Sequence, residues 1–209
     1  MGVIPEPLVT LALSGSPFPS TLAAEAFVFA MAVWIASEIV GGAIVPALRR
    51  GGRRVQRRNL GSNTLVLLSW IFMFVVAGSF AADNIAMLPA WVSYLGAAVV
   101  ILGVAIRQWA IAVLGRFFSG VIGVQTGQNV VESGPYKLVR HPSYTGVLVL
   151  ELGIGLALRS LAAIPVIVLL FALAYGYRML VEEKVLASEL GDSYRAYMKR
   201  TKRVIPFVV

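Results

Sequence analysis

The chain has 209 residues and a formal net charge of +8, with 58% apolar residues, 13% charged residues and a mean hydropathy of +0.83. Soluble domains are usually about half apolar and about a quarter charged, so this composition indicates an integral membrane protein. The absence of Cys and the single His exclude disulfide bonds, thiolate metal sites and His-cluster metal sites. The basic residues lie between apolar segments rather than on one solvated face, so we do not expect nucleic acid as a partner. Because thiolate and His-cluster sites are excluded, we also expect no metal.

Apolar runs predict an all-α membrane protein with five transmembrane helices, because a helix of about 20 residues crosses a bilayer core of about 30 Å. Acids inside such helices are candidates for functional sites. The first predicted span contains Glu38 and the fourth contains Glu151, and the sequence names no partner for either. Pro89 is expected to open the third helix. The five predicted spans are residues 23–48, 62–82, 85–113, 143–158 and 160–181 of a single membrane domain that covers residues 1–209.

Basic residues predict the orientation of these spans. Residues 49–58 contain six Arg and no acid, and short loops of this kind stay in the cytoplasm. Residues 1–20, with four Pro and no Lys or Arg, then form an external tail. Residues 115–142 and 182–209 lie in the cytoplasm, and Arg159 is the one basic residue of 18 expected outside. We therefore expect a plasma-membrane protein with its N-terminus outside and its C-terminus in the cytoplasm.

The cytoplasmic residues predict two local structures. Residues 121–124 and 129–131 resemble short extended stretches around a Thr-Gly turn. After the last span, Tyr194, Tyr197 and Arg200 fit a C-terminal amphipathic helix on the membrane surface, or a lid over a ligand.

A cluster of polar residues is expected where the last two spans meet the cytoplasm. Arg178 and Glu182 are four residues apart, so they share one helix face. A short turn after residue 158 makes the two spans an antiparallel hairpin, which brings this pair level with Arg140, His141 and Tyr144. Pro142 suits a first helical turn, whose free N–H groups favour an anion. The arrangement predicts a site for a charged small molecule beside the lipid.

These residues resemble the isoprenylcysteine carboxyl methyltransferase family and its prokaryotic relatives, which are integral membrane methyltransferases. The resemblance covers roughly residues 115–206. It is carried by four strings: Ser133-Gly134-Pro135-Tyr136; Arg140-His141-Pro142-Ser143-Tyr144-Thr145-Gly146; Arg178-Met179-Leu180-Val181-Glu182-Glu183; and Leu190-Gly191-Asp192-Ser193-Tyr194-Arg195-Ala196-Tyr197. The Arg-His-Pro string followed by the paired Glu residues is specific, whereas either part alone would be weak.

The resemblance implies S-adenosylmethionine as methyl donor, bound by the cytoplasmic elements 115–142 and 182–209. Arg178 and Glu182 are then the catalytic residues, with Arg178 at the reacting group of the substrate. The family commonly has His where this chain has Gln128, and Gln cannot titrate, so a proton role at this position is not expected. The donor is expected to contact Gln128, Asn129, Val130, Val131, Tyr136, Arg140, His141, Pro142, Ser143, Tyr144, Glu182 and Glu183.

The resemblance further implies a carboxylate acceptor on a lipophilic or prenylated molecule that enters from the bilayer. Methylation of a phospholipid amine or of a small thiol is an alternative within the same class. A non-catalytic binding or transport protein with a degenerate donor pocket is an alternative from another class. Each polar residue also has a purely structural interpretation: His141 could bond a nearby carbonyl, Arg178 could anchor the helix at the interface, and the tyrosines could belong to an aromatic belt.

Overall fold

The computed structural model describes residues 17–45, 48, 61–120 and 122–206, and within them it is helical and contains no β-strand. The basic loop 49–58 and residues 1–16 of the expected tail lie outside the described residues. The long helices are α2 (Thr21–Ser37), its π-helical continuation η1 (Glu38–Ile44), α4 (Gly61–Ala82), α5 (Val92–Leu114), α6 (Pro142–Ala157), α7 (Ala163–Glu189) and the short α8 (Gly191–Arg200).

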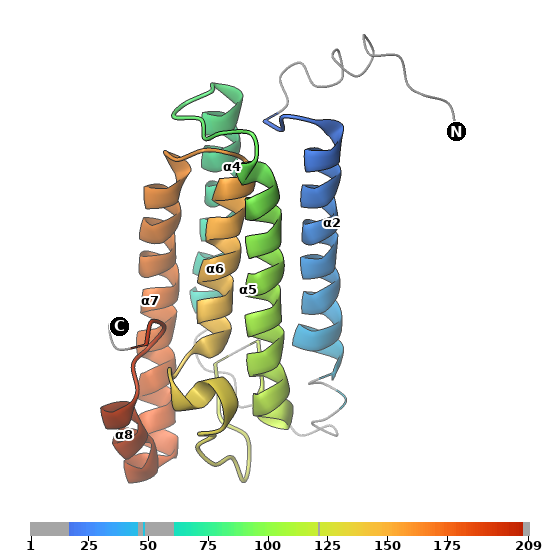
Figure 1. Ribbon diagram of the computed structural model, residues 1–209. Helices are drawn as coiled ribbons and strands as arrows, with labels where there is room; N and C mark the ends of the chain where they lie inside the picture. The colour runs from blue at the N-terminus through green and yellow to red at the C-terminus, as the bar shows by residue number, and fades with distance from the viewer. Residues whose placement is uncertain (1–16, 46–47, 49–60, 121, 207–209) are drawn as a thin grey trace.

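The long helices stand side by side, and α8 lies at the same end of the bundle as the start of α6 (Figure 1). Four helical segments of the described chain are long and apolar enough to cross a membrane: Thr21–Ile44, Gly61–Ala82, Val92–Phe117 and Ala163–Glu189. Helix α6 has 16 residues, or about 24 Å at 1.5 Å per residue, which is less than a full bilayer core. The all-α membrane class is therefore confirmed, while the fifth span remains a prediction.

Two helix boundaries differ from the expected ones for identifiable reasons. Helix α5 begins at Val92 rather than near residue 85, because the preceding loop pairs with the α6–α7 turn. In that pairing Leu88 N donates to Arg159 O at 2.7 Å, and Arg159 Nε donates to Leu88 O at 2.8 Å. Helix α7 continues to Glu189 because no Pro follows the first turn of this helix, and it ends just before Gly191, whose φ is +62°. Arg178, Glu182 and Glu183 consequently project from one continuous helix.

Helices α5 and α6 pack closely enough for their backbones to touch. A Cβ atom on Gly103 would lie 2.5 Å from Leu150 N, and one on Gly146 would lie 2.7 Å from Arg107 N. Only glycine permits such an approach, and small residues are common where membrane helices meet. This packing fixes the start of α6 beside the C-terminal end of α5.

The segment between α5 and α6 is irregular rather than extended. Gln128 N donates to Gln125 O at 3.0 Å across a turn in which Gly127 has a φ of +73°, while Val121 lies outside the described residues. The C-terminal residues run back against the start of α6: Arg140 N donates to Lys202 O at 2.7 Å, and His141 N donates to Arg203 O at 2.9 Å. The C-terminal segment therefore braces the loop that leads into α6.

Candidate active site

A cavity of about 270 Å³ lies at the end of the bundle where α6 begins. Its walls come from α4, α5, α6 and α7, from the irregular segment 117–136 and from α8. The spans contribute apolar and aromatic side chains such as Val66 and Trp70, whereas the irregular segment contributes amides such as Gln128 and Asn129. The cavity thus combines apolar and aromatic side chains with charged and amide groups, and both kinds come from the helices and from the segment 117–136 together.

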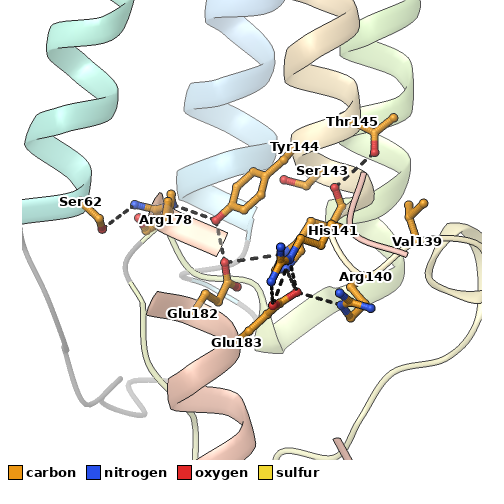
Figure 2. Close-up of polar contacts among 12 residues, drawn as sticks. Ser62, Val139, Arg140, His141, Ser143, Tyr144, Thr145, Arg178, Glu182 and Glu183 are labelled. Atoms are coloured by element: carbon orange, nitrogen blue, oxygen red, sulfur yellow. Dashed lines mark hydrogen bonds and ion pairs between the residues drawn. The ribbon is translucent and has the colours of Figure 1, made fainter. Parts of the chain in front are cut away.

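Tyr144 links the two ionised residues of α7 inside this cavity. Its hydroxyl donates to Glu182 Oε2 at 2.7 Å and accepts from Arg178 Nε at 2.8 Å (Figure 2). The sequence suggested a direct pairing of Arg178 with Glu182, but the tyrosine of the neighbouring helix bridges them. The three side chains therefore form one chain across the α6–α7 interface.

The guanidinium of Arg178 is held from three sides. Besides Tyr144 it donates to Asn63 Oδ1, to Ser62 Oγ at 3.2 Å and to Gly120 O at 2.8 Å. Arginine has five N–H donors, and these contacts leave one N–H of Nη2. A carboxylate could therefore take one hydrogen bond from Arg178 as it stands, and a bidentate contact would require loss of Ser62 or Asn63.

Glu183 faces a different set of partners, behind the cavity. Its carboxylate accepts from Arg140 Nε at 2.8 Å and from Arg203 Nη2 at 2.9 Å, and His141 Nε2 lies 3.3 Å away. The residue is 4% exposed. Arg140 also donates to Met198 O at 3.0 Å, so this cluster joins α7, the start of α6 and the C-terminal segment.

His141 lies between the two carboxylates. Its Nδ1 is 3.8 Å from Glu182 Oε2, and its Nε2 is 3.3 Å from Glu183 Oε1. The imidazole is stacked on the ring of Tyr144, with centroids 5.3 Å apart. Helix packing and both acids thus fix its orientation at the cavity wall.

Helix α8 contributes two tyrosines to the cavity wall. Tyr197 Oη donates to Tyr136 O at 2.7 Å, and both residues line the cavity together with Tyr194. Burial raises the pKa of Tyr197 to about 12, so its phenol stays a neutral donor at physiological pH. Arg200 extends the contact on the surface, where its Nη2 lies 3.0 Å from Glu132.

Most of the predicted site residues come together at the cavity, and two do not. Pro142 is fully buried at the start of α6 and Glu183 lies behind the wall, so neither lines the cavity. Gln128 lines it while its Oε1 accepts from Gln125 N at 3.0 Å, so the amide stabilises its own turn. The predicted residues that line the cavity are Gln128, Asn129, Val130, Val131, Tyr136, Arg140, His141, Ser143, Tyr144, Arg178 and Glu182.

Sequence reasoning missed the contribution of the first three spans. Glu38 has a partner after all: Arg107 Nη2 donates to Glu38 Oε2 at 2.7 Å, and Arg107 Nη1 donates to Ser143 Oγ at 2.8 Å. This ion pair connects the first span to the first turn of α6, and Arg107 itself lines the cavity. The position of Arg107 inside a predicted span could have indicated this pair, since a lone Arg in one span suggests pairing with an acid of another span. Asn63 carried no such signal.

Residues 95–188 match the family described as the isoprenylcysteine carboxyl methyltransferase (ICMT) family. Protein-S-isoprenylcysteine O-methyltransferase B of Arabidopsis thaliana is 32% identical over 124 residues, which are 56% of this chain and 61% of the relative. A probable protein-S-isoprenylcysteine O-methyltransferase of Oryza sativa subsp. indica is 29% identical over 163 residues, or 73% of this chain and 84% of the relative. This chain thus spans about three fifths of the length of the Arabidopsis relative.

A solved structure has the same arrangement of helices. The eukaryotic intramembrane Ras methyltransferase isoprenylcysteine carboxyl methyltransferase superposes with a TM-score of 0.65 and 25% identity, covering 96% of this chain and 72% of that one. The sequence match contains α6 and most of α5 and α7, which supply the walls of the cavity. Over the helices that form the cavity walls, the chain is therefore similar to the isoprenylcysteine carboxyl methyltransferase family.

Proposed function

We propose that the chain is an S-adenosylmethionine-dependent methyltransferase that methylates a carboxylate on a lipophilic acceptor of the isoprenylcysteine type. The similarity to this family supports the methyltransferase class. The observation that carries the proposal is the hydrogen-bonded chain from Arg178 through Tyr144 to Glu182, at the wall of a cavity that also has apolar and aromatic side chains. These apolar side chains suit an acceptor that enters from the bilayer.

The polar groups of the cavity are suited to bind a cationic methyl donor. S-adenosylmethionine supplies an electrophilic methyl group on a positively charged sulfur. The side chain of Glu182 is 29% exposed, and Tyr144 orients its carboxylate at the cavity wall, where it attracts positive charge. The segment 128–131 adds backbone and amide groups that can hold the polar parts of the donor.

Arg178 is suited to orient the acceptor. A carboxylate is ionised at neutral pH, so it needs no general base before it attacks a methyl group. One N–H of Arg178 can hold one carboxylate oxygen while the other oxygen attacks. The negative charge of the carboxylate disappears during the transfer, so tighter charge pairing would stabilise the ground state more than the transition state. A single hydrogen bond in a partly desolvated cavity fits this requirement.

The distribution of charge supports a cytoplasmic position for the cavity. Among the described residues, Arg159 lies at the opposite end of the bundle, in the α6–α7 turn. The positive-inside rule supports a cytoplasmic position for the cavity and the C-terminus, with the N-terminus outside. The plasma membrane is the membrane that we propose. The basic residues near the cavity end include Arg107, Arg116, Lys137, Arg140, Lys184 and Arg195.

A labelled-methyl assay tests the proposal. Purified protein is given methyl-labelled S-adenosylmethionine and N-acetyl-S-farnesylcysteine, and the product is treated with alkali. A methyl ester releases volatile labelled methanol, whereas a methylated phospholipid amine or thiol does not. If the label transferred to a membrane lipid extract survives alkali, the acceptor is a phospholipid amine or a thiol rather than a carboxylate. Thermal stabilisation by the donor with no transfer to any lipid would instead favour the non-catalytic alternative.

A further inference from the structure

Three arginines line the cavity, and they differ in how their charge is balanced. Arg140 forms an ion pair with Glu183 at 2.8 Å. Arg107 forms an ion pair with Glu38 through two contacts. Arg178 makes no ion pair within the described residues, where its partners are hydroxyl, amide and carbonyl oxygens. Glu38 thus removes a positive charge at the cavity wall, although it has no part in the site as described so far.

The pair of Arg107 and Glu38 has a bidentate geometry. Arg107 donates through Nε to Glu38 Oε1 and through Nη2 to Glu38 Oε2, the second contact at 2.7 Å. Its Nη1 donates to Ser143 Oγ, in the first turn of α6, at 2.8 Å. Arginine has five N–H donors, so two of those on Arg107 remain for a group in the cavity. Glu38 therefore fixes the orientation of a guanidinium that can still reach a ligand.

The backbone of the first span brings Glu38 against α5. The helix changes from α to π at this residue, and single π turns are rare but frequent at functional sites. Beside the pair, Gln108 Nε2 donates to Ser37 O at 3.1 Å. A Cβ atom on Gly41 would lie 1.8 Å from Gln108 Oε1, so only glycine permits this approach of the two helices. Packing next to the ion pair therefore keeps Glu38 in place.

The pairing decides which charges the cavity offers to its ligands. With Arg107 and Arg140 neutralised, the guanidinium of Arg178 and the carboxylate of Glu182 are left, one cation and one anion. The proposed reaction brings together one anionic acceptor and one cationic donor. A second free guanidinium at the wall would repel the donor and would offer the acceptor carboxylate a second binding position.

We propose that Glu38 is a positioning residue that acts through Arg107. By cancelling the charge of this guanidinium, it lets the cavity accept a cationic methyl donor and leaves Arg178 as the only cation for the acceptor carboxylate. Glu38 itself does not line the cavity. It also lies outside residues 95–188, which match the family. The inference rests on the proposed function for the identity of the two ligands.

The charge of the donor gives a test that general loss of structure would not imitate. S-adenosylmethionine has a positive sulfonium, whereas S-adenosylhomocysteine has a neutral thioether in its place. Glu38→Gln removes the charge and keeps an oxygen that accepts from Arg107. We expect the dissociation constant of S-adenosylmethionine to rise about tenfold and that of S-adenosylhomocysteine to rise less than about threefold, because the unpaired guanidinium repels the sulfonium. Isothermal titration of the purified protein measures both constants without turnover.

The acceptor should respond in the opposite direction. The unpaired guanidinium attracts a carboxylate, so we expect the KM of N-acetyl-S-farnesylcysteine in Glu38→Gln to fall about threefold. Methyl-transfer kinetics at saturating donor measure it. A purely structural loss would weaken the donor and the acceptor together.

Substitution of Arg107 should reverse the change. In the double variant Glu38→Gln with Arg107→Gln, the ratio of the two dissociation constants should return to within about twofold of its original value, because both charges are gone. Arg107→Gln alone leaves the acid unpaired and should shift the ratio in favour of S-adenosylmethionine. Glu25→Gln is the matched control, since Glu25 is an exposed acid of α2 in the same span, and it should leave the ratio unchanged.

The possible outcomes separate this inference from the proposed function. Equal weakening of both adenosyl ligands in Glu38→Gln, or a changed ratio that Arg107→Gln does not restore, overturns the role of Glu38 and leaves the methyltransferase intact. If thermal unfolding shows that Glu38→Gln does not fold, the direction of the shift in Arg107→Gln alone decides. If both ligands bind the unchanged protein without any methyl transfer, the proposed function is wrong while the ratio still tests Glu38. If neither ligand binds the unchanged protein, the proposed function and this inference are both wrong.

Discussion

Two adjacent carboxylates on α7 have opposite surroundings. Glu182 is partly exposed at the cavity, where Tyr144 donates to it and His141 approaches at 3.8 Å. Glu183 is buried behind the wall, between Arg140, His141 and Arg203. The first carboxylate has capacity left for a cationic ligand, whereas the second has its charge fully matched by the protein.

This difference assigns the two residues to different roles: Glu182 is available to bind a ligand, and Glu183 stabilises the fold. Successive helical residues point about 100° apart, so a single helix can present one acid to a ligand and the next to the scaffold. A buried acid with several cationic partners becomes expensive to remove, because its partners are left unpaired. Removal of a partly exposed acid with one neutral partner changes the stability of the protein little, but it weakens the binding of a cationic ligand. Substitutions at each residue should therefore have effects of different kinds.

The largest expected effect is on stability, in Glu183→Ala. Removing this carboxylate leaves the buried Arg140 without its counter-ion, which should lower the free energy of unfolding by about 3 to 5 kcal/mol. Thermal unfolding of the purified protein in detergent measures the change. Glu182→Ala is the matched control one residue away and should change the stability by less than about 1 kcal/mol. Similar losses for the two variants would refute the separation of roles.

The second largest effect is on turnover, in Arg178→Lys. Lysine keeps the charge but cannot hold Tyr144, Ser62 and Gly120 O in the same fixed geometry. We expect kcat to fall about 100-fold, as for loss of a positioned donor, with the affinity for the methyl donor unchanged within about twofold. Methyl-transfer kinetics and isothermal titration with S-adenosylmethionine measure the two quantities. A parallel loss of donor affinity would place Arg178 in the donor site instead.

Glu182→Gln should have a smaller effect of the complementary kind. The amide keeps the size of the side chain and removes the charge, so we expect the dissociation constant of S-adenosylmethionine to rise about tenfold. The same titration measures it, and thermal unfolding without ligand should be unchanged. Adenosine is a useful control ligand, because it lacks the cationic methionine part of the donor. It should bind Glu182→Gln and the unchanged protein equally. If Glu182→Gln binds S-adenosylmethionine as tightly as the unchanged protein does, Glu182 does not face the donor.

Local sequence patterns predicted the membrane class and the convergence of α6 with α7. Apolar runs mark helices directly, and the short turn after residue 158 leaves those two helices no arrangement but antiparallel. The shared helix face of Arg178 and Glu182, and the Pro-initiated turn after His141, then meet by geometry alone. This part of the site depended on contacts between two helices that are consecutive in the chain.

Contacts between distant elements could not be predicted in the same way. Nothing in the sequence distinguishes Ser62 and Asn63 from other polar residues at a helix start, yet they hold Arg178 across more than 100 positions. The contrast between Glu182 and Glu183 was also hidden, because it depends on where the C-terminal segment brings Arg203. Sequence spacing gives the face of a helix, but only tertiary packing determines which groups occupy the facing surface.

The smallest expected effect comes from an ion pair at the surface. Arg200 and Glu132 lie 3.0 Å apart with side chains 62% and 41% exposed, in contrast to the buried pairs of Glu183. Water and salt screen such a pair, so Arg200→Ala should lower the free energy of unfolding by less than about 0.5 kcal/mol, and the loss should disappear at high salt. Thermal unfolding at low and high salt measures it beside Glu183→Ala. A large, salt-independent loss in Arg200→Ala would mean that pairing alone, and not burial, makes the Glu183 cluster important for stability.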